Sequence, residues 1–227
     1  MNNYAEIIII VEGRTEQIFI EKLLAPYLAS KNIYIRATQV SKPGQKGGDV
    51  HFSRVKKDLE LHLKQRSDTF LSTMVDYYGI KEWPGLEVAK TLKSPFEISK
   101  TINESTKKEV ENLFPELKTN FRFIPYIAIH EFEALLFSDA EILSNKLGVA
   151  KTKVEAAITE FESPEAINNN PNTAPSKRLN NWSPNHNFRK TTMGITIAEA
   201  IGIQKMRDNC PLFNAWLKEI EKIKNIL

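Results

Sequence analysis

The chain opens with a continuous apolar run that is followed by a helical pattern. The residues from Ile7 to Val11 are all β-branched, as is typical of a strand buried on both faces of a parallel sheet. The run ends at the segment Glu-Gly-Arg-Thr-Glu, residues 12–16, and apolar residues then recur at helical spacing as far as Leu28. A buried strand, a glycine turn and a helix in succession predict the start of an α/β sheet, with Glu12 at the carboxyl end of its first strand.

Three later apolar runs predict further strands: Ile33 to Val40, Thr69 to Val75 and Phe121 to Ile129. Pro125 in the last run indicates a bulge or an exposed sheet edge, because proline has no N–H to donate. We expect residues 80–104 to be irregular, before a helix over residues 105–113.

A glycine-rich segment, residues 43–48, follows the second predicted strand. It lacks the Gly-Lys-Ser/Thr ending of a nucleotide-binding P-loop, which excludes that interpretation. Lys46 within it is a candidate contact for a phosphate backbone, and an ordinary surface loop is the alternative.

The segment His-Glu-Phe-Glu-Ala-Leu-Leu-Phe, residues 130–137, follows the last predicted strand. Read as a helix start, it places His130 and Glu133 on one face. The remainder is predicted to be helical, with a loop over residues 163–184. We therefore expect an α/β domain over residues 1–145 and a helical C-terminal extension over residues 146–227 that packs on it.

Composition narrows the class of protein. The chain of 227 residues is 41% hydrophobic and 26% charged, as in an ordinary globular protein, and it has neither a membrane-span pattern nor a signal-peptide pattern. A single cysteine, Cys210, excludes an internal disulfide framework, and we expect a cytoplasmic protein. The net charge of +3 is too small to indicate a nucleic-acid binder by itself.

The distribution of charge is more informative than the total. Residues 163–207 contain six Lys or Arg against two Glu, whereas residues 101–139 contain seven acids against four bases. The basic segment includes Lys177, Arg178 and Lys190, which are candidate contacts for nucleic-acid phosphates. A solvated loop is the alternative interpretation of Lys177 and Arg178.

Carboxylates follow three of the predicted strands: Glu12, Asp76, and Glu131 with Glu133. Because the carboxyl ends of parallel strands meet at one sheet edge, this pattern predicts an oxygen-rich site of the kind that Mg²⁺ prefers. The histidines and the one cysteine have no zinc-ligand spacing. An alternative interpretation remains open for residues 12–16. Thr15 and Glu16 are residues that commonly begin a helix, so they need no catalytic role, but a helix start does not explain Glu12 well.

These residues resemble known families. The strand ending in Glu12-Gly13, with Asp76 after a later strand, is similar to the Toprim domain of topoisomerases, primases and OLD-type nucleases. The whole chain resembles more closely the bacterial family known as domain of unknown function DUF4276, held to be Toprim-related. The shared motifs are EGRTE (12–16), DYYG (76–79), HEFEALLF (130–137), PSKRL (175–179) and CPLFNAW (210–216).

The resemblance implies a Toprim-like (Rossmann-like) fold, a four-stranded and mostly parallel sheet flanked by helices. It also implies Mg²⁺ or Mn²⁺ at the strand ends, phosphodiester cleavage on DNA or RNA, and an ABC-type ATPase partner in bacterial defence. A homodimer is left open. Toprim enzymes carry Asp-x-Asp, whereas Asp76 is followed here by Tyr77-Tyr78, so Glu131 or Glu133 has to replace the second acid.

The chemistry then suggests a division of roles. Asp76 and Glu133, helped by Glu16 or Glu131, are expected to hold the metal. Glu12 is expected to act as general acid or base and as a further metal ligand, with His130 as a second acid–base candidate. A function of another class stays open: a catalytically silent Toprim-like module that binds the ATPase or a nucleotide, with the last helix as its docking surface.

Overall fold

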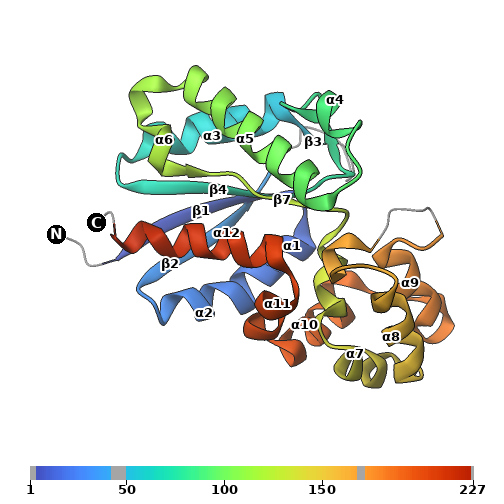
Figure 1. Ribbon diagram of the computed structural model, residues 1–227. Helices are drawn as coiled ribbons and strands as arrows, with labels where there is room; N and C mark the ends of the chain where they lie inside the picture. Colours follow the sequence, from blue (N-terminus) through green and yellow to red (C-terminus); the bar gives the residue numbers. More distant parts are fainter. Residues whose placement is uncertain (1–3, 42–49, 168–171, 226–227) are drawn as a thin grey trace.

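A parallel sheet forms the centre of the molecule (Figure 1). The computed structural model describes residues 4–41, 50–167 and 172–225. The central strands are β1 (Ala5–Val11), β2 (Ile33–Gln39), β4 (Thr69–Asp76), β6 (Phe123–Ile124) and β7 (Ile127–Ala128). Their order is β2-β1-β4-β6, β7 also pairs with β4, and every pairing is parallel. The predicted α/β class with a parallel sheet is confirmed.

The predicted fourth strand is two short strands instead of one. Pro125 lies between β6 and β7, and both strands pair with β4 at the edge of the sheet. The proline was predicted to mark a bulge or an edge, and the edge is what the structure shows. A separate parallel pair, β3 (Val50–His51) with β5 (Ile80–Lys81), lies outside this sheet.

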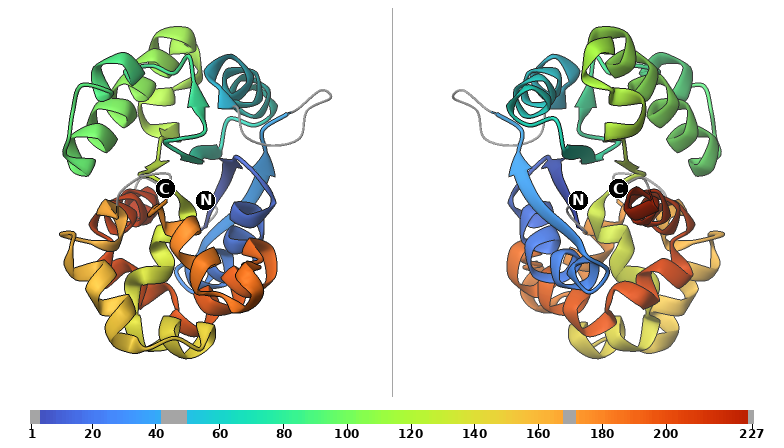
Figure 2. Two further views of the ribbon diagram at one scale, coloured as in Figure 1. Left: turned by 90° about the vertical axis from the view of Figure 1, so that its right-hand side faces the viewer. Right: turned by 90° about the vertical axis from the view of Figure 1, so that its left-hand side faces the viewer.

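Helices cover both faces of the sheet (Figure 2). One face carries α3 (Phe52–Gln65), α4 (Leu86–Ala89), α5 (Pro95–Leu113), η2 (Pro115–Leu117) and α6 (Thr119–Arg122). The other carries α1 (Arg14–Phe19), the π-helical turn η1 (Ile20–Leu24), α2 (Ala25–Ala29), α12 (Pro211–Lys222) and η7 (Ile223–Asn225). The remaining helices form a lobe beyond the carboxyl ends of the strands: η3 (Phe132–Ser138), α7 (Ala140–Leu147), α8 (Lys151–Thr159), η4 (Pro164–Ala166), α9 (Pro175–Trp182), η5 (Pro184–His186), η6 (Lys190–Gly194), α10 (Ile195–Ile201) and α11 (Ile203–Asn209).

Strand β1 contributes side chains to both hydrophobic cores. Ile7 and Ile9 belong to the apolar cluster on the α1 side, whereas Ile8 and Ile10 belong to the cluster under α3 and α5. Side chains alternate between the two faces of a strand, so a strand covered on both faces must be apolar at every position. This is why the uninterrupted β-branched run of the sequence lies in the centre of the sheet.

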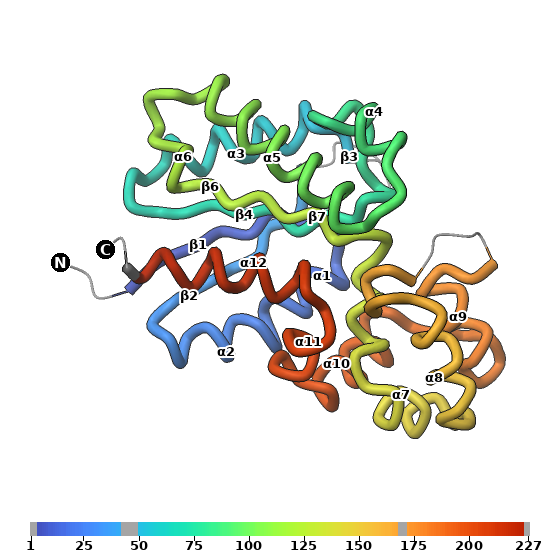
Figure 3. The backbone as a smooth tube through the Cα atoms, viewed as in Figure 1, coloured from blue at the N-terminus to red at the C-terminus, as the bar shows by residue number. Residues whose placement is uncertain are grey.

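One of these clusters contains residues on both sides of residue 145, from Ala5 to Ile223. Helix α12 runs alongside strands from the first half of the chain (Figure 3). Trp216 on this helix stacks on Tyr126, with ring centroids 4.5 Å apart, and its Nε1 donates to Ser72 Oγ at 2.9 Å. The last helix therefore completes a layer of the sheet.

Two segments that were expected to be irregular are helical. Helix α5 begins at Pro95, ten residues before the predicted start at 105, because Ser94 accepts a hydrogen bond from Glu97 N and proline is favourable at the first helical position. Helix α9 lies within the predicted loop 163–184 and also begins at a proline, Pro175. No helix among the described residues is both long and apolar enough to span a membrane.

Candidate active site at the strand ends

The carboxyl ends of β1 and β4 bring Glu12 and Asp76 to the same edge of the sheet. The two strands pair in parallel with Val11 opposite Met74, so Glu12 leaves β1 beside the end of β4. Strand β7 pairs with the same end of β4, with Ala128 opposite Asp76. The chain therefore passes directly from β7 into residues 130–133 next to Asp76, as the strand-end argument predicted.

Glu12 points across a tight turn that follows β4. In this turn Gly79 N donates to Asp76 O at 2.9 Å. A Cβ added to Gly79 would lie 2.4 Å from Glu12 Oε2, so the Glu12 carboxylate would have to shift. The glycine of the DYYG motif is thus required for the close approach of the Glu12 carboxylate.

Asp76 has several other acids near it. Its Oδ1 accepts a hydrogen bond from Phe132 N at 3.2 Å. Burial raises the pKa of Asp76 well above its usual range, and the nearby carboxylates of Glu16, Glu133 and Glu12 raise it further. We call these four side chains, Glu12, Glu16, Asp76 and Glu133, the acidic cluster.

Glu133 is the most deeply buried member of the acidic cluster. It lies in η3 with 1% of its surface exposed, and Lys190 Nζ approaches its Oε1 to 2.9 Å. Among the described residues, nothing donates a hydrogen bond to Glu133 Oε2. Burial raises the pKa of Glu133, and the attraction of Lys190 opposes that rise. A buried carboxylate oxygen without a donor indicates a place for a cation.

Glu16 and Glu131 have structural partners of their own. Glu16 Oε2 accepts from Gly13 N at 3.1 Å, which closes the first turn of α1. Glu131 accepts from Ser176 N and from Ser176 Oγ, both at 2.8 Å, and so caps the N-terminus of α9. The structure therefore joins the HEFEALLF and PSKRL motifs through this cap.

His130 and Tyr78 form a pair beside the acidic cluster. His130 has a left-handed backbone, with φ of 70°, so it does not lie in the helix that follows. Its ring stacks on Tyr78 with centroids 5.2 Å apart, and its Nδ1 is hydrogen-bonded to the Tyr78 hydroxyl. Burial lowers the pKa of His130 to about 4, so the ring is neutral near pH 7 and only weakly basic.

The predicted basic residues do not gather in one place. Lys46 lies outside the described residues. Lys177 is exposed on α9, whereas Arg178 donates to Thr173 O at 2.8 Å and pairs with Glu160 at 3.1 Å. Lys190 reaches into the acidic cluster, a position that no local sequence pattern indicates.

The ligand atoms of the acidic cluster suit Mg²⁺, because they are all carboxylate oxygens. In addition, no group among the described residues donates a hydrogen bond to Glu133 Oε2. Within the described residues, however, no group of three or more His, Cys, Asp or Glu side chains is arranged to hold a metal ion. Side chains of the acidic cluster must therefore move for a divalent ion to bind.

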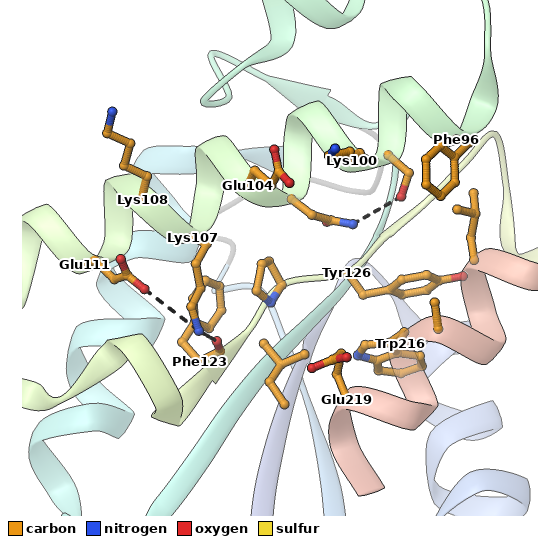
Figure 4. A pocket seen from close by; sticks show the side chains of 16 residues that line it. Phe96, Lys100, Glu104, Lys107, Lys108, Glu111, Phe123, Tyr126, Trp216 and Glu219 are labelled. Carbon is orange, nitrogen blue, oxygen red and sulfur yellow. Dashed lines mark hydrogen bonds and ion pairs between the residues drawn. The ribbon is translucent and has the colours of Figure 1, made fainter. Parts of the chain in front are cut away.

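A separate groove lies between α5 and α12 (Figure 4). It has a volume of about 730 Å³ and shares no lining residue with the acidic cluster. Its floor includes Tyr126 and Trp216, and Phe96 at its rim is 63% exposed. The last helix was expected to be a docking surface in the alternative function, but this groove was not predicted, because the helix α5 that forms its other wall was predicted to begin later.

Sequence reasoning also missed Tyr78, Gly79 and Ser176 as parts of the site. All three lie inside motifs that the analysis had singled out, DYYG and PSKRL, and that membership was the available signal.

Comparison with known proteins gives one family. Neither the curated proteins nor the solved structures provide a match. Residues 11–221 match the family described as Domain of unknown function (DUF4276), a range that starts before Glu12 and ends in α12. Because the match covers nearly the whole chain and every element of the site, this protein belongs to the DUF4276 family.

Proposed function

We propose that this protein is a metal-dependent phosphodiesterase of the Toprim type that cleaves nucleic acid with Mg²⁺ or Mn²⁺. The proposal includes an ABC-type ATPase partner in a bacterial defence system, as the resemblance implies.

One observation carries the proposal: the buried Glu133 carboxylate, with an oxygen that lacks a hydrogen-bond donor among the described residues, beside Asp76. Ionised acids gathered in a low-dielectric environment are unfavourable unless a cation compensates them or a proton neutralises them. Lys190 is a single positive charge near the four acids of the cluster. A divalent ion would supply the rest, because Mg²⁺ and Mn²⁺ bind to carboxylate oxygens.

The residues of the chain then have distinct roles. Asp76 and Glu133 would hold the ion, which when bound neutralises charge that develops on the phosphate. Glu12, fixed over Gly79, accepts the proton of the attacking water, a role that its position at the strand end permits. Lys177 contacts the nucleic-acid backbone from the exposed side of α9 and contributes affinity without sequence preference.

The test compares the wild type with Glu12→Gln, which keeps the size of the side chain but removes its ionisable group. Both proteins are assayed on single-stranded DNA, double-stranded DNA and RNA, with Mg²⁺ or Mn²⁺, and with and without the ATPase. Glu141→Gln on α7 is the matched control, because that carboxylate is 69% exposed. We expect cleavage by the wild type and the control, and its loss in Glu12→Gln at an unchanged melting temperature. A wild type that stays silent with the ATPase present, or a Glu12→Gln variant that cleaves equally well, contradicts the proposal.

The alternative function is a catalytically silent module that docks on the ATPase. The observation that favours it is the groove between α5 and α12, with Phe96 exposed at its rim. If this function is correct, Phe96→Asp weakens ATPase binding while Glu12→Gln does not change it. Calorimetry with the purified ATPase distinguishes the two outcomes.

A further inference from the structure

Lys190 is held at the acidic cluster by the fold and not by its neighbours in sequence. It is the first residue of η6, which packs on α1 and on η3. These two elements carry Glu16 and Glu133. Helix η6, from the C-terminal half of the chain, therefore packs beside the acidic cluster. The side chain of Lys190 is 45% exposed along its length, whereas its partner Glu133 is 1% exposed.

Two other bases, on the helices α1 and α9, have different partners. Arg14, at the start of α1, donates to Gln17 Oε1 at 3.0 Å, and Arg178 pairs with Glu160. Three carboxylates act to raise the pKa of Asp76, and the one cation that opposes them is Lys190. Within the described residues, Lys190 is thus the cation that the fold directs at this cluster.

The two oxygens of Glu133 are not equivalent. Oε1 lies 2.9 Å from Lys190 Nζ, while Oε2 has no hydrogen-bond donor among the described residues. A carboxylate can hold a cation on each oxygen. One oxygen of Glu133 therefore already faces a cation, whereas the other is buried without a donor among the described residues.

The chain also lacks a second acid after Asp76. The residue two positions after Asp76 is Tyr78, so there is no carboxylate at this position. The Tyr78 hydroxyl is hydrogen-bonded to His130. Sites with two metal ions about 4 Å apart use several carboxylates to compensate four positive charges. A two-metal site would need further negative charge here, but the acidic cluster has the positively charged Lys190 instead.

We infer that Lys190 is the resident second cation of this site: Glu133, whose Oε1 faces Lys190, would hold one divalent ion together with Asp76, so each chain binds one ion. This inference rests on the proposed function and specifies it as a one-metal site. Lys190 is a positioning residue for the ion.

The test is the stoichiometry and affinity of Mn²⁺ binding, measured by calorimetry and by electron paramagnetic resonance without substrate. The variants are Lys190→Met, which removes the charge at similar length, and Lys190→Arg, which keeps it. Lys205→Met is the matched control, because Lys205 is a half-exposed lysine paired with an acid elsewhere, Asp139 at 3.7 Å.

We expect one Mn²⁺ per chain with the spectrum of an isolated ion in the wild type, in Lys190→Arg and in Lys205→Met. In Lys190→Met the missing charge is replaced by metal, so either a second, magnetically coupled ion binds or the single ion binds about tenfold tighter or more. Melting temperatures confirm that each variant is folded.

Two results overturn the inference. If the wild type binds two magnetically coupled ions, Lys190 is not a substitute for the second ion. This result would leave the proposed metal-dependent function unaffected. Unchanged affinity and stoichiometry in a folded Lys190→Met variant show that Lys190 does not act on the ion. Absence of Mn²⁺ binding from every variant at millimolar concentration contradicts the proposed function itself.

Discussion

The carboxylate of Glu12 lies against Gly79, so that a Cβ on the glycine would be 2.4 Å from Glu12 Oε2. This relationship joins the EGRTE motif at the end of β1 to the DYYG motif after β4. The two motifs are about sixty residues apart in the sequence, and their contact places the Glu12 carboxylate against the turn that follows β4.

Gly79→Ala is expected to displace the Glu12 carboxylate and to lower the free energy of unfolding by about 1 kcal/mol, the low end of the usual cost of an added methyl group, because the atoms that it meets are the end of a flexible side chain. Any cleavage activity that depends on Glu12 is expected to fall with it. Urea unfolding and the nuclease assay measure the two effects. Gly194→Ala is the control, because its added Cβ meets nothing closer than 3.4 Å. Equal effects of the two substitutions would show that the Glu12–Gly79 contact is unimportant.

Glu131 and Ser176 are expected to be energetically coupled through the cap of α9. Both Glu131 oxygens accept from Ser176, and hydrogen bonds to a charged group contribute about 1.5–3 kcal/mol. Glu131→Ala should lower the free energy of unfolding, and Ser176→Ala should lower it less, because the backbone N–H of residue 176 remains.

A double-mutant cycle with urea unfolding isolates this coupling. If the two substitutions are additive, the cap contributes nothing to stability and Glu131 is available for another role, such as metal binding.

Glu165 is expected to make stability fall as the pH rises. It is 3% exposed and accepts hydrogen bonds from Leu212 N and Phe213 N, each at 2.8 Å, at the start of α12. Burial raises the pKa of Glu165 to about 7, against an ordinary value of 4.5. Between these two values the folded state binds the proton and the unfolded state does not, so the free energy of unfolding decreases with increasing pH.

The decrease should amount to about 3 kcal/mol at most between pH 4.5 and pH 8, relative to Glu165→Gln, which cannot titrate. Urea unfolding of the two proteins at several pH values gives this difference directly. A difference that stays constant with pH, or that grows in favour of the wild type, contradicts the prediction.

Lys177 and Arg178 are expected to differ although they are adjacent. Lys177 is exposed on α9, so Lys177→Ala should reduce the slope of log affinity against log salt for double-stranded DNA by about 0.9, the value for one phosphate contact. Arg178 supports the fold through Thr173 and Glu160, so Arg178→Ala should reduce stability by about 1 kcal/mol with a smaller change in slope. Lys222→Ala on α12 is the control, because that lysine pairs with Glu219. A slope unaffected by Lys177→Ala would assign α9 to another partner.

The sequence by itself determined the class of fold and the position of the candidate site. An uninterrupted β-branched run such as Ile7 to Ile10 is stable only when both faces are covered, so it predicts a central strand of a parallel sheet. Parallel strands end at one edge, so Glu12 and Asp76 had to be neighbours once their strands paired. The apolar face of α12 was also predictable, because helical periodicity is a local property.

Only the tertiary structure decided which partners these residues take. Glu131 caps α9, Tyr78 binds His130, and Lys190 faces Glu133, and each of these contacts joins segments 45 or more residues apart. Local periodicity reports which face of an element is buried, but not which distant element covers that face. The difference between a carboxylate that caps a helix and one that is available for a cation depends on which donors the folded chain brings to it. For Glu131 and Glu133, two positions apart in the sequence, the fold brings Ser176 to the first and Lys190 to the second.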